Sequence, residues 1–396
     1  MTNATKAAPL ASLLCAFVAA VLIAVSAPVI ASADESRACI PGSDKCGYDY
    51  RIIWDRVYGD AALDTMKEAV LHRGVGFVPR GSGVDHFDTS SPDKPAPDCV
   101  VVCTSRGWWD ALSASGLAGI ENAPVLLTEP DELSTQTRAA IKALAPSRAI
   151  VVGGEAAVSA RVAAQLADLV GSEPERVWGE DAVGTSLAVL ASSGSWSPTA
   201  FVATSGTFQD ALSAGPYAYA RRCPVVLAGA DGVLSVEAAS ALGSGAFSEV
   251  VVLGGEGAVP SSELGRLGVA APERVWGADA VGTCAALLDW QAARGYRFWG
   301  GGVATAEDYH DALVASACCG RHGLGLALVG YNLDGYEDWW SAVSALKRCQ
   351  APVDRDTKCE GFVFGGEAAV SRGDFLNLPF WPPSPPYWDL VDPCEP

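Results

Sequence analysis

The chain is poor in basic residues and in charge as a whole. It has 27 lysines and arginines against 46 aspartates and glutamates, a formal net charge of -19, and only 18% of its 396 residues are charged. A protein that binds nucleic acid by neutralising phosphates needs the opposite balance, so we expect no nucleic-acid partner. With 49% hydrophobic residues, the chain also lacks the composition of a disordered protein, and it is long enough for two to four folded units.

Catalytic and cofactor motifs are missing as well. There is no Gly-x-Ser-x-Gly elbow, no His-Glu-x-x-His pair, no Walker lysine and no glycine-rich nucleotide loop, and the cysteines do not form the Cys-x-x-Cys pairs of a zinc site. We therefore expect no enzyme activity, no cofactor and no metal. A carboxylate pair for glycoside cleavage stays open, because acids are plentiful and their separation in the fold is not visible in a sequence.

Residues 1–33 have the pattern of a secretory signal peptide. Lys6 precedes an apolar run from Ala7 to Ile30, and a small-residue cleavage site ends at Ala33. The run is also long enough for a retained membrane anchor. We expect cleavage, and therefore a secreted protein with no membrane partner.

Twelve cysteines are present, and one of them falls in the signal peptide. In an exported protein we expect some of the others to form disulfides. Cys39 with Cys46, and Cys349 with Cys359, are near enough in sequence to close short loops.

Three short motifs each occur three times in the same order. An Arg-Val-aromatic-Gly segment ends at Gly59, Gly179 and Gly277. The other two motifs are Asp-Ala-Leu, which begins at Asp110, Asp210 and Asp311, and Gly-Gly-Glu, which begins at Gly153, Gly254 and Gly365. Such ordered repetition indicates a triplicated module.

We therefore divide the mature chain into three modules, preceded by a segment 34–49 and followed by a proline-rich tail 377–396. Modules one and three carry insertions at about 72–98 and 332–359, which are expected to be surface loops because they are rich in glycine, proline, aspartate or aromatic residues. The modules span 50–171, 172–269 and 270–376.

Within each module, apolar runs alternate with helical patterns. The runs lie at 100–103, 125–127 and 149–152 in module one, at 201–203, 225–227 and 250–253 in module two, and at 302–304, 326–328 and 362–364 in module three. Continuous apolar strands that alternate with helices are typical of parallel sheets covered on both faces. The sequence predicts an α/β fold of three tandem Rossmann-like, three-layer modules.

The repeated residues have structural interpretations. A carboxylate in the first turn of a helix caps backbone N–H groups, and this role is favoured for the Asp-Ala-Leu aspartates. The arginines of the Arg-Val-aromatic-Gly segments are expected to pair with Asp181 and Asp279, with an anionic ligand as the alternative. Trp178 and Trp276 are expected to be buried packing residues rather than platforms for sugars.

The loops before Asp-Ala-Leu are candidates for a ligand site. They should lie beyond the carboxyl ends of strands, where open parallel sheets bind ligands. Stacking on a sugar and burial against a neighbouring module explain their aromatic residues equally well. The candidates are Trp108, Trp109 and Asp110, then Thr207, Phe208 and Asp210, then Tyr309 and Asp311.

Together, the ordered motifs resemble the cell wall-binding repeat 2 (CWB2) family. Modules of that family open with Arg-x-x-Gly-x-Asp, carry Asp-Ala-Leu after a strand, continue into proline and aliphatic residues, and close with Gly-Gly-x-x-Ala-Val. The resemblance covers about residues 50–376 in three copies. It implies modules in an approximate threefold arrangement that hold surface-layer-like proteins on the Gram-positive wall without a covalent bond, with an anionic wall polysaccharide as ligand.

The resemblance also implicates the aliphatic residues after the proline in attachment. These are Val125, Leu126, Leu127, Val225, Val226, Leu227, Leu326 and Leu328. On physical grounds they are core strand residues, which is the interpretation we favour. The arginine of the family's Asp-Arg-x-x-Thr segment is missing here, so an anionic polymer needs another basic site, such as Arg221 and Arg222, or a bridging cation.

The sequence thus favours a non-catalytic protein that binds the wall. One alternative is a surface assembly or adhesion protein whose modules only pack together, while Trp339-Trp340, or Trp381 and Trp388 in the tail, contact other surface proteins. The second alternative is an enzyme that acts on wall glycans.

Overall fold

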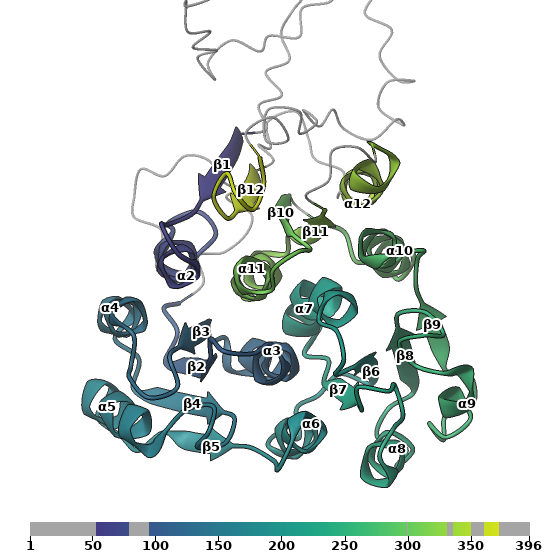
Figure 1. Ribbon diagram of the computed structural model, residues 1–396, viewed down its shortest axis with the longest axis horizontal. Coiled ribbons are helices and arrows are strands. Elements are labelled where there is room, and N and C mark those ends of the chain that lie inside the picture. Colours follow the sequence, from purple (N-terminus) through teal and green to yellow (C-terminus); the bar gives the residue numbers. More distant parts are fainter. Residues whose placement is uncertain (1–52, 79–94, 299, 331–335, 350–359, 372–396) are drawn as a thin grey trace, which may run out of the picture. The chain divides into compact units, whose positions relative to one another are not determined.

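The computed structural model describes residues 53–78, 95–298, 300–330, 336–349 and 360–371 (Figure 1). The chain divides into two compact units, Met1–Asp49 and Tyr50–Pro396, and all described residues belong to the second. The predicted signal peptide, the segment 34–49 and the tail with Trp381 and Trp388 lie outside the described residues.

The described chain forms three four-stranded sheets in which every pairing is parallel. In order across each sheet, the strands are β3 (Val125–Thr128), β2 (Cys99–Thr104), β4 (Arg148–Val152) and β5 (Glu175–Val177); β7 (Val225–Ala228), β6 (Thr199–Thr204), β8 (Glu249–Leu253) and β9 (Glu273–Val275); and β11 (Gly325–Val329), β10 (Gly301–Thr305), β12 (Glu360–Phe364) and β1 (Ile53–Val57). The predicted α/β modules with parallel sheets are therefore confirmed.

Helices connect the strands and cover the sheets. They are α2 (Ala62–Leu71), α3 (Trp109–Glu121), α4 (Thr135–Leu144), α5 (Ala160–Val170), α6 (Ala182–Ala191), α7 (Gln209–Arg221), α8 (Val236–Leu242), α9 (Ser261–Leu264), α10 (Ala280–Ala293), α11 (His310–His322) and α12 (Tyr336–Arg348). All six residues of β2 and of β6 are buried, as expected for strands covered on both faces. Ser134, Ser159 and Ser235 are N-caps whose side chains accept a backbone N–H, which fixes where α4, α5 and α8 begin.

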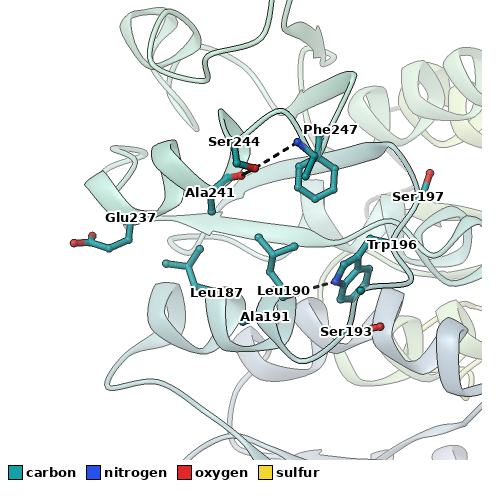
Figure 2. A pocket seen from close by; sticks show the side chains of 12 residues that line it. Leu187, Leu190, Ala191, Ser193, Trp196, Ser197, Glu237, Ala241, Ser244 and Phe247 are labelled. Carbon is teal, nitrogen blue, oxygen red and sulfur yellow. Dashed lines mark hydrogen bonds between the residues drawn. The ribbon is translucent and has the colours of Figure 1, made fainter.

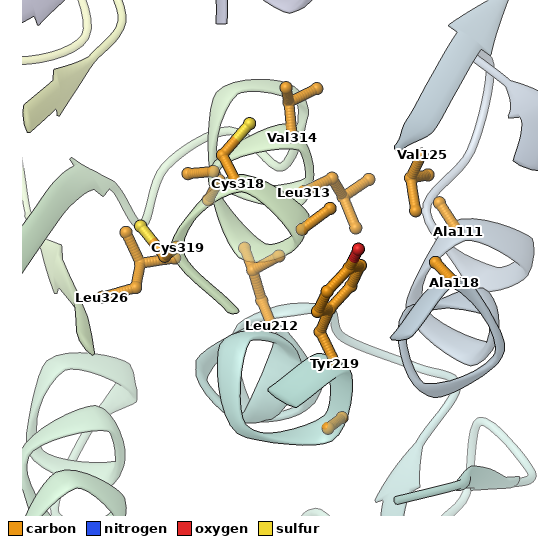
Figure 3. Close-up of a cluster of buried hydrophobic side chains, with 14 of the residues drawn as sticks. Ala111, Ala118, Val125, Leu212, Tyr219, Leu313, Val314, Cys318, Cys319 and Leu326 are labelled. Atoms are coloured by element: carbon orange, nitrogen blue, oxygen red, sulfur yellow. The ribbon is translucent and has the colours of Figure 1, made fainter. Parts of the chain in front are cut away.

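Helices α3, α7 and α11, one from each module, pack against one another. The contact is close because small residues line it: a Cβ atom on Gly119 would lie 2.0 Å from the Tyr219 carbonyl oxygen. Figure 3 shows side chains from these helices, among them Leu212, Leu313 and Tyr219, gathered in one buried cluster. A shared core therefore joins the three modules.

The fourth strand of each sheet is an Arg-Val-aromatic-Gly segment. It pairs with the last strand of the repeat before it, since β5 pairs with β4 and β9 with β8. Strand β1, where the described chain begins, pairs with β12 near its end, with Ile53 opposite Glu360. The first strand thus completes the third sheet. The module boundaries given above stay a prediction.

The two insertions differ from the surface loops that we expected. Helix α12 occupies part of 332–359, and its residues Ala342, Val343 and Leu346 are buried. The parallel connection from β11 to β12 needs a crossover, which α12 supplies as α4 and α8 do in the other modules. In the insertion 72–98, Val75 and Phe77 are buried, and residues 79–94 lie outside the described part.

The seven cysteines within the described ranges are buried free thiols, so the disulfides that we expected are not found among them. Cys349 donates to the Leu288 carbonyl oxygen, at 3.2 Å, and its predicted partner Cys359 lies outside these ranges, as do Cys39 and Cys46. Among the helices that the structure describes, none combines the length and the apolar character needed to cross a bilayer.

Candidate ligand-binding site

The Asp-Ala-Leu aspartates lie against the Gly-Gly-Glu turns. Asp110 lies in the first turn of α3, as predicted, but the N-cap residue is Trp108, whose side chain makes no capping bond. A Cβ atom on Gly153 would lie 2.4 Å from Asp110 Oδ2, and the φ angle of Gly153 is +119°, so only glycine fits there. The same arrangement joins Asp210 to Gly254 and Asp311 to Gly365. The aspartate side chains therefore pack against the glycine turns rather than cap the helices.

A threonine from α6, α10 or α2 completes each cluster. Thr185 accepts a hydrogen bond from the Gly179 N–H at 3.1 Å and donates its hydroxyl to the Asp110 carboxylate. Burial raises the pKa of Asp110 to about 6, although the bond from Thr185 opposes the shift. The equivalent pairs are Asp210 with Thr283 and Asp311 with Thr65; burial raises both aspartate pKa values, to about 6 for Asp311.

The arginines of the Arg-Val-aromatic-Gly segments hold the same turns through backbone carbonyls. Arg176 donates to Gly153 at 2.8 Å, Arg274 to Gly254 at 2.7 Å, and Arg56 to Gly365 at 3.0 Å. The predicted pairing with Asp181 and Asp279 is wrong. Both aspartates are N-caps, of α6 and α10, and accept from backbone N–H groups.

The aromatic residue of each of these segments is exposed. Tyr58, Trp178 and Trp276 keep 53%, 53% and 56% of their accessible surface. The prediction that the two tryptophans are buried is wrong, because the preceding Val177 and Val275 point into the core and the next side chain therefore points away from it. Each ring lies beside the second glycine of a Gly-Gly-Glu turn: a Cβ atom on Gly154 would be 3.4 Å from Trp178.

The aromatic residues before Asp-Ala-Leu meet one another. The ring centroids of Trp108, Phe208 and Tyr309 are 5.4, 5.6 and 5.7 Å apart in their three pairs. Trp109 lies on Trp108, with 4.5 Å between centroids, and Thr207 is exposed nearby in the sequence. These rings were expected either to stack on a sugar or to pack against a neighbouring module, and their contacts are those of packing between modules.

Hydrogen bonds join the modules in cyclic order at this place. Trp109 Nε1 donates to the Ser205 carbonyl oxygen at 2.8 Å. The equivalent Gln209 lies 3.5 Å from the Ala306 carbonyl oxygen, and the equivalent His310 lies 3.0 Å from that of Ser105. The predicted threefold arrangement is therefore seen in the contacts. Gln209 and His310 were not among the predicted site residues, although they occupy the position of Trp109 in their own loops.

A crevice of about 550 Å³ opens at the carboxyl ends of β10, β12 and β1. Among its lining residues are Asp60, Thr65, Glu307, Asp308 and Asp311, together with Gly366, which lies beside the Tyr58 ring. Asp311 Oδ1 is buried and accepts no hydrogen bond from the described part of the chain. An acceptor of this kind suits a ligand that brings hydroxyl groups.

The aliphatic residues implicated by the family resemblance lie in the core. None of the eight side chains exposes more than 2% of its surface: Val125, Leu126, Leu127, Val225, Val226, Leu227, Leu326 and Leu328. They form β3, β7 and β11 and offer no surface to a polymer. The core interpretation favoured from the sequence is confirmed.

A second cavity, of about 520 Å³, lies at the carboxyl ends of α3, α7 and α11. The C-cap residues of these helices, Asn122, Arg222 and Gly323, line it together with Arg321 and His322. Arg222 is exposed, whereas Arg321 is 2% exposed and donates to the Asn122 side chain. Of the two predicted arginines only Arg222 lines this cavity, since Arg221 lies over the Tyr296 ring at 5.0 Å.

A third pocket, between α6 and α8, is mainly apolar (Figure 2). Leu187, Leu190, Trp196 and Phe247 line it, and Trp196 Nε1 donates to the Leu190 carbonyl oxygen at 2.8 Å. None of the residues predicted for ligand binding belongs to its lining. The predicted candidates instead divide between the strand ends, the core and the helix ends.

Comparison with known proteins identifies related sequences. Residues 64–163 and 176–263 match the family model of cell wall binding domain 2 (CWB2). The chain is 30% identical to the N-acetylmuramoyl-L-alanine amidase LytC of Bacillus subtilis (strain 168) over 180 residues, which are 46% of this chain and 35% of that protein. It is also 30% identical to the amidase enhancer of the same organism over 161 residues, 40% of this chain and 22% of the relative.

Two solved structures share the fold. Cwp6 from Clostridium difficile superposes with a TM-score of 0.65 over 82% of this chain and 48% of its own, and Cwp8 with 0.66 over 83% and 51%. Both are 20% identical to this chain, so the likeness concerns the fold alone. The family resemblance predicted from the motifs is thus confirmed over the two segments that match the model of cell wall binding domain 2.

Proposed function

We propose that the protein is a secreted, non-catalytic surface protein that binds the Gram-positive cell wall non-covalently through an anionic secondary polysaccharide. The observation that carries the proposal is the match of residues 64–163 and 176–263 to a cell wall binding domain. The matched segments contain β2, β3 and β4 of one sheet and β6, β7 and β8 of the next, and the third sheet repeats this architecture.

The helix-end cavity supports an anionic ligand. Arg222, Arg321 and His322 line one cavity in a chain whose net charge is -19, so this is a locally basic place on an acidic protein. Arginine suits carboxylate and phosphate groups because its planar fork donates two parallel hydrogen bonds. Binding through exposed Arg222 should weaken as salt screens the charges.

The test is sedimentation of the mature protein with isolated walls, before and after chemical removal of the secondary polymers. We expect stripping to remove most of the retention and Arg222→Glu to reduce retention on intact walls. Arg161→Glu makes the same change of charge at an exposed residue of α5, outside the cavity, and should bind as the wild type does. Equal retention on intact and stripped walls would contradict the polymer as ligand.

The strand-end crevice favours one second function, an enzyme acting on wall glycans. Asp311, whose pKa burial raises to about 6, lies in one crevice with Glu307 and Asp308, and paired carboxylates of unequal pKa are the groups of glycoside cleavage. Against it, the same aspartate cluster occurs in all three modules, as a structural unit would. Release of labelled fragments from purified wall glycan, abolished by Asp311→Asn, would replace the binding function with catalysis.

A further inference from the structure

Three exposed aromatic rings occupy equivalent positions in the three repeats. Tyr58, Trp178 and Trp276 are the only aromatic residues among the exposed large hydrophobic side chains of the described ranges. Burial of such a ring would stabilise the folded protein by about 25 cal/mol for each Å² of apolar surface removed from water, and an exposed ring does not contribute this free energy. A repeated exposure at this cost is explained by a ligand that covers the rings.

We propose that each ring is a platform on which the flat face of an uncharged pyranose sugar stacks, so that the protein carries three equivalent glycan sites. Beside each ring lies a glycine: a Cβ atom would be 3.4 Å from Trp178 at Gly154, 3.6 Å from Trp276 at Gly255 and 3.8 Å from Tyr58 at Gly366. Because glycine has no side chain, nothing from the turn covers the ring. The ring's negative face attracts the C–H groups of a sugar.

The groups around the rings favour a sugar without negative charge. Asp60 follows the Tyr58 segment, Asp181 the Trp178 segment and Asp279 the Trp276 segment, and all three carboxylates are exposed. In the crevice beside Tyr58, Glu307, Asp308 and the unsatisfied Asp311 Oδ1 add acceptors. Carboxylates repel an anionic polymer but accept hydrogen bonds from sugar hydroxyls.

These sites are separate from the basic cavity assigned to the anionic polymer. The rings lie at the carboxyl ends of the strands, near the start of α3, α7 and α11, and the basic cavity lies at the other end of these helices. Each of the three helices has 13 residues, which is about 20 Å of length. The inference rests on the proposed function only in taking wall glycan as the ligand.

The sugar could belong to the peptidoglycan or to the secondary polysaccharide, so the experiment has two arms. In the first, binding is measured to walls stripped of secondary polymers. In the second, it is measured to the released polymers in high salt, where the charge-dependent contribution of Arg222 is screened. The variant is Tyr58→Ala/Trp178→Ala/Trp276→Ala. Its matched control is Val236→Ala, which removes an apolar side chain that is 73% exposed on α8, outside the strand-end turns.

We expect the triple variant to bind at least about tenfold more weakly in one arm, which then identifies the source of the sugar. Val236→Ala should bind like the wild type. Replacing Trp178 and Trp276 by phenylalanine should keep most of the binding, because a stacking face remains. Circular dichroism checks folding; if the triple variant is misfolded, the three single alanine variants take its place, each with a smaller loss.

Two results would overturn the inference: ring variants that bind as the wild type does in both arms, or a wild type that binds in neither. Arg222→Glu separates this failure from failure of the polymer proposal. It should lower binding to the released polymers at low salt and leave the salt-resistant binding unchanged. Loss of the salt-resistant binding in Arg222→Glu would also count against separate sites.

Discussion

The two ends of helices α3, α7 and α11 are built in different ways. At their amino-terminal ends, each module supplies the same groups: an aspartate closed on a glycine turn, a threonine and an exposed ring. At their carboxyl ends the three C-cap residues are all different, Asn122, Arg222 and Gly323, and the arginines that line the cavity are the C-cap of α7 and Arg321 of α11. The groups at the amino-terminal ends are repeated in every module, whereas the basic cavity at the carboxyl ends is formed once, by the three modules together. Comparison of the repeats therefore distinguishes features of a single module from features of the three-module assembly.

The largest effect is expected where a turn meets its aspartate. Gly153→Ala should lower the free energy of unfolding by about 4 kcal/mol, because the new methyl group meets Asp110 Oδ2 and the backbone has a positive φ. Gly154→Ala is the matched control, with an ordinary 3.4 Å contact to Trp178, and should cost less than about 1 kcal/mol. Urea unfolding measures both. Equal losses would mean that the aspartate does not shape the turn.

At the helix ends, the corresponding test is Arg321→Ala. Buried Arg321 donates to the Asn122 side chain and to the Pro95 carbonyl oxygen, and its guanidinium lies over the Phe77 ring at 4.7 Å. Losing these contacts should cost about 3 kcal/mol. Exposed Arg222→Ala should change stability by less than about 0.5 kcal/mol, and a similar cost for the two variants in urea unfolding would contradict the division of roles.

Thr185→Val tests the hydrogen-bonded link between modules. The substitution leaves the Gly179 N–H and the Asp110 carboxylate without their shared partner, which should cost about 2 kcal/mol. Thr135→Val, at an exposed residue of α4, should cost less than about 0.5 kcal/mol under the same conditions. Thermal unfolding followed by circular dichroism is sufficient, and an unchanged midpoint for Thr185→Val would exclude the link.

Asp110 also predicts a dependence of stability on pH. Its folded-state pKa of about 6 lies above the usual 3.8, so its contribution is complete below pH 3.8 and is lost as the pH rises through 6. Asparagine cannot ionise. Asp110→Asn should therefore gain stability relative to the wild type on going from pH 4 to pH 7, by about 2 kcal/mol. A difference that is the same at both pH values would show that this carboxyl has an ordinary pKa.

The smallest effect is expected at the exposed rings. Trp178→Ala should change the free energy of unfolding by less than about 0.5 kcal/mol, because more than half of the ring is already in water. Trp108→Ala, in the cluster between the modules, should cost several times more. If Trp178→Ala were as destabilising as Trp108→Ala in urea unfolding, the ring would have a packing role instead of a ligand role.

Much of the fold could be predicted because nine strands are continuous apolar runs, such as 100–103 within β2. The fourth strand of each sheet could not be predicted in this way. Strands β5 and β9 have three residues each, of which only the valine is buried, and their hydrogen-bonding partners lie in the preceding repeat. Helix α12 was missed because an aromatic-rich stretch suggested an insertion, although the parallel connection requires a crossover.

For the site, motif repetition located the residues but not their roles. Asp110 was recognised, yet its contact with Gly153 joins segments separated by the rest of α3 and by β3, α4 and β4. Trp178 is exposed because its side chain points away from the core after buried Val177. Arg176 donates to a backbone carbonyl, and because every residue has one, the sequence does not reveal this partner. Such facts are set by tertiary packing rather than by local pattern.

The pairing of β1 with β12 has a consequence for biogenesis. The strand that is synthesised early finds its partner only when nearly the whole described chain has emerged, since Ile53 lies opposite Glu360. Until then the third sheet lacks its edge strand, and Arg56 cannot donate its hydrogen bond to the Gly365 carbonyl oxygen. The last module to be completed therefore depends on β1, which is translated before every other described strand, so a proteolytic cut near residue 53 would destabilise the third sheet.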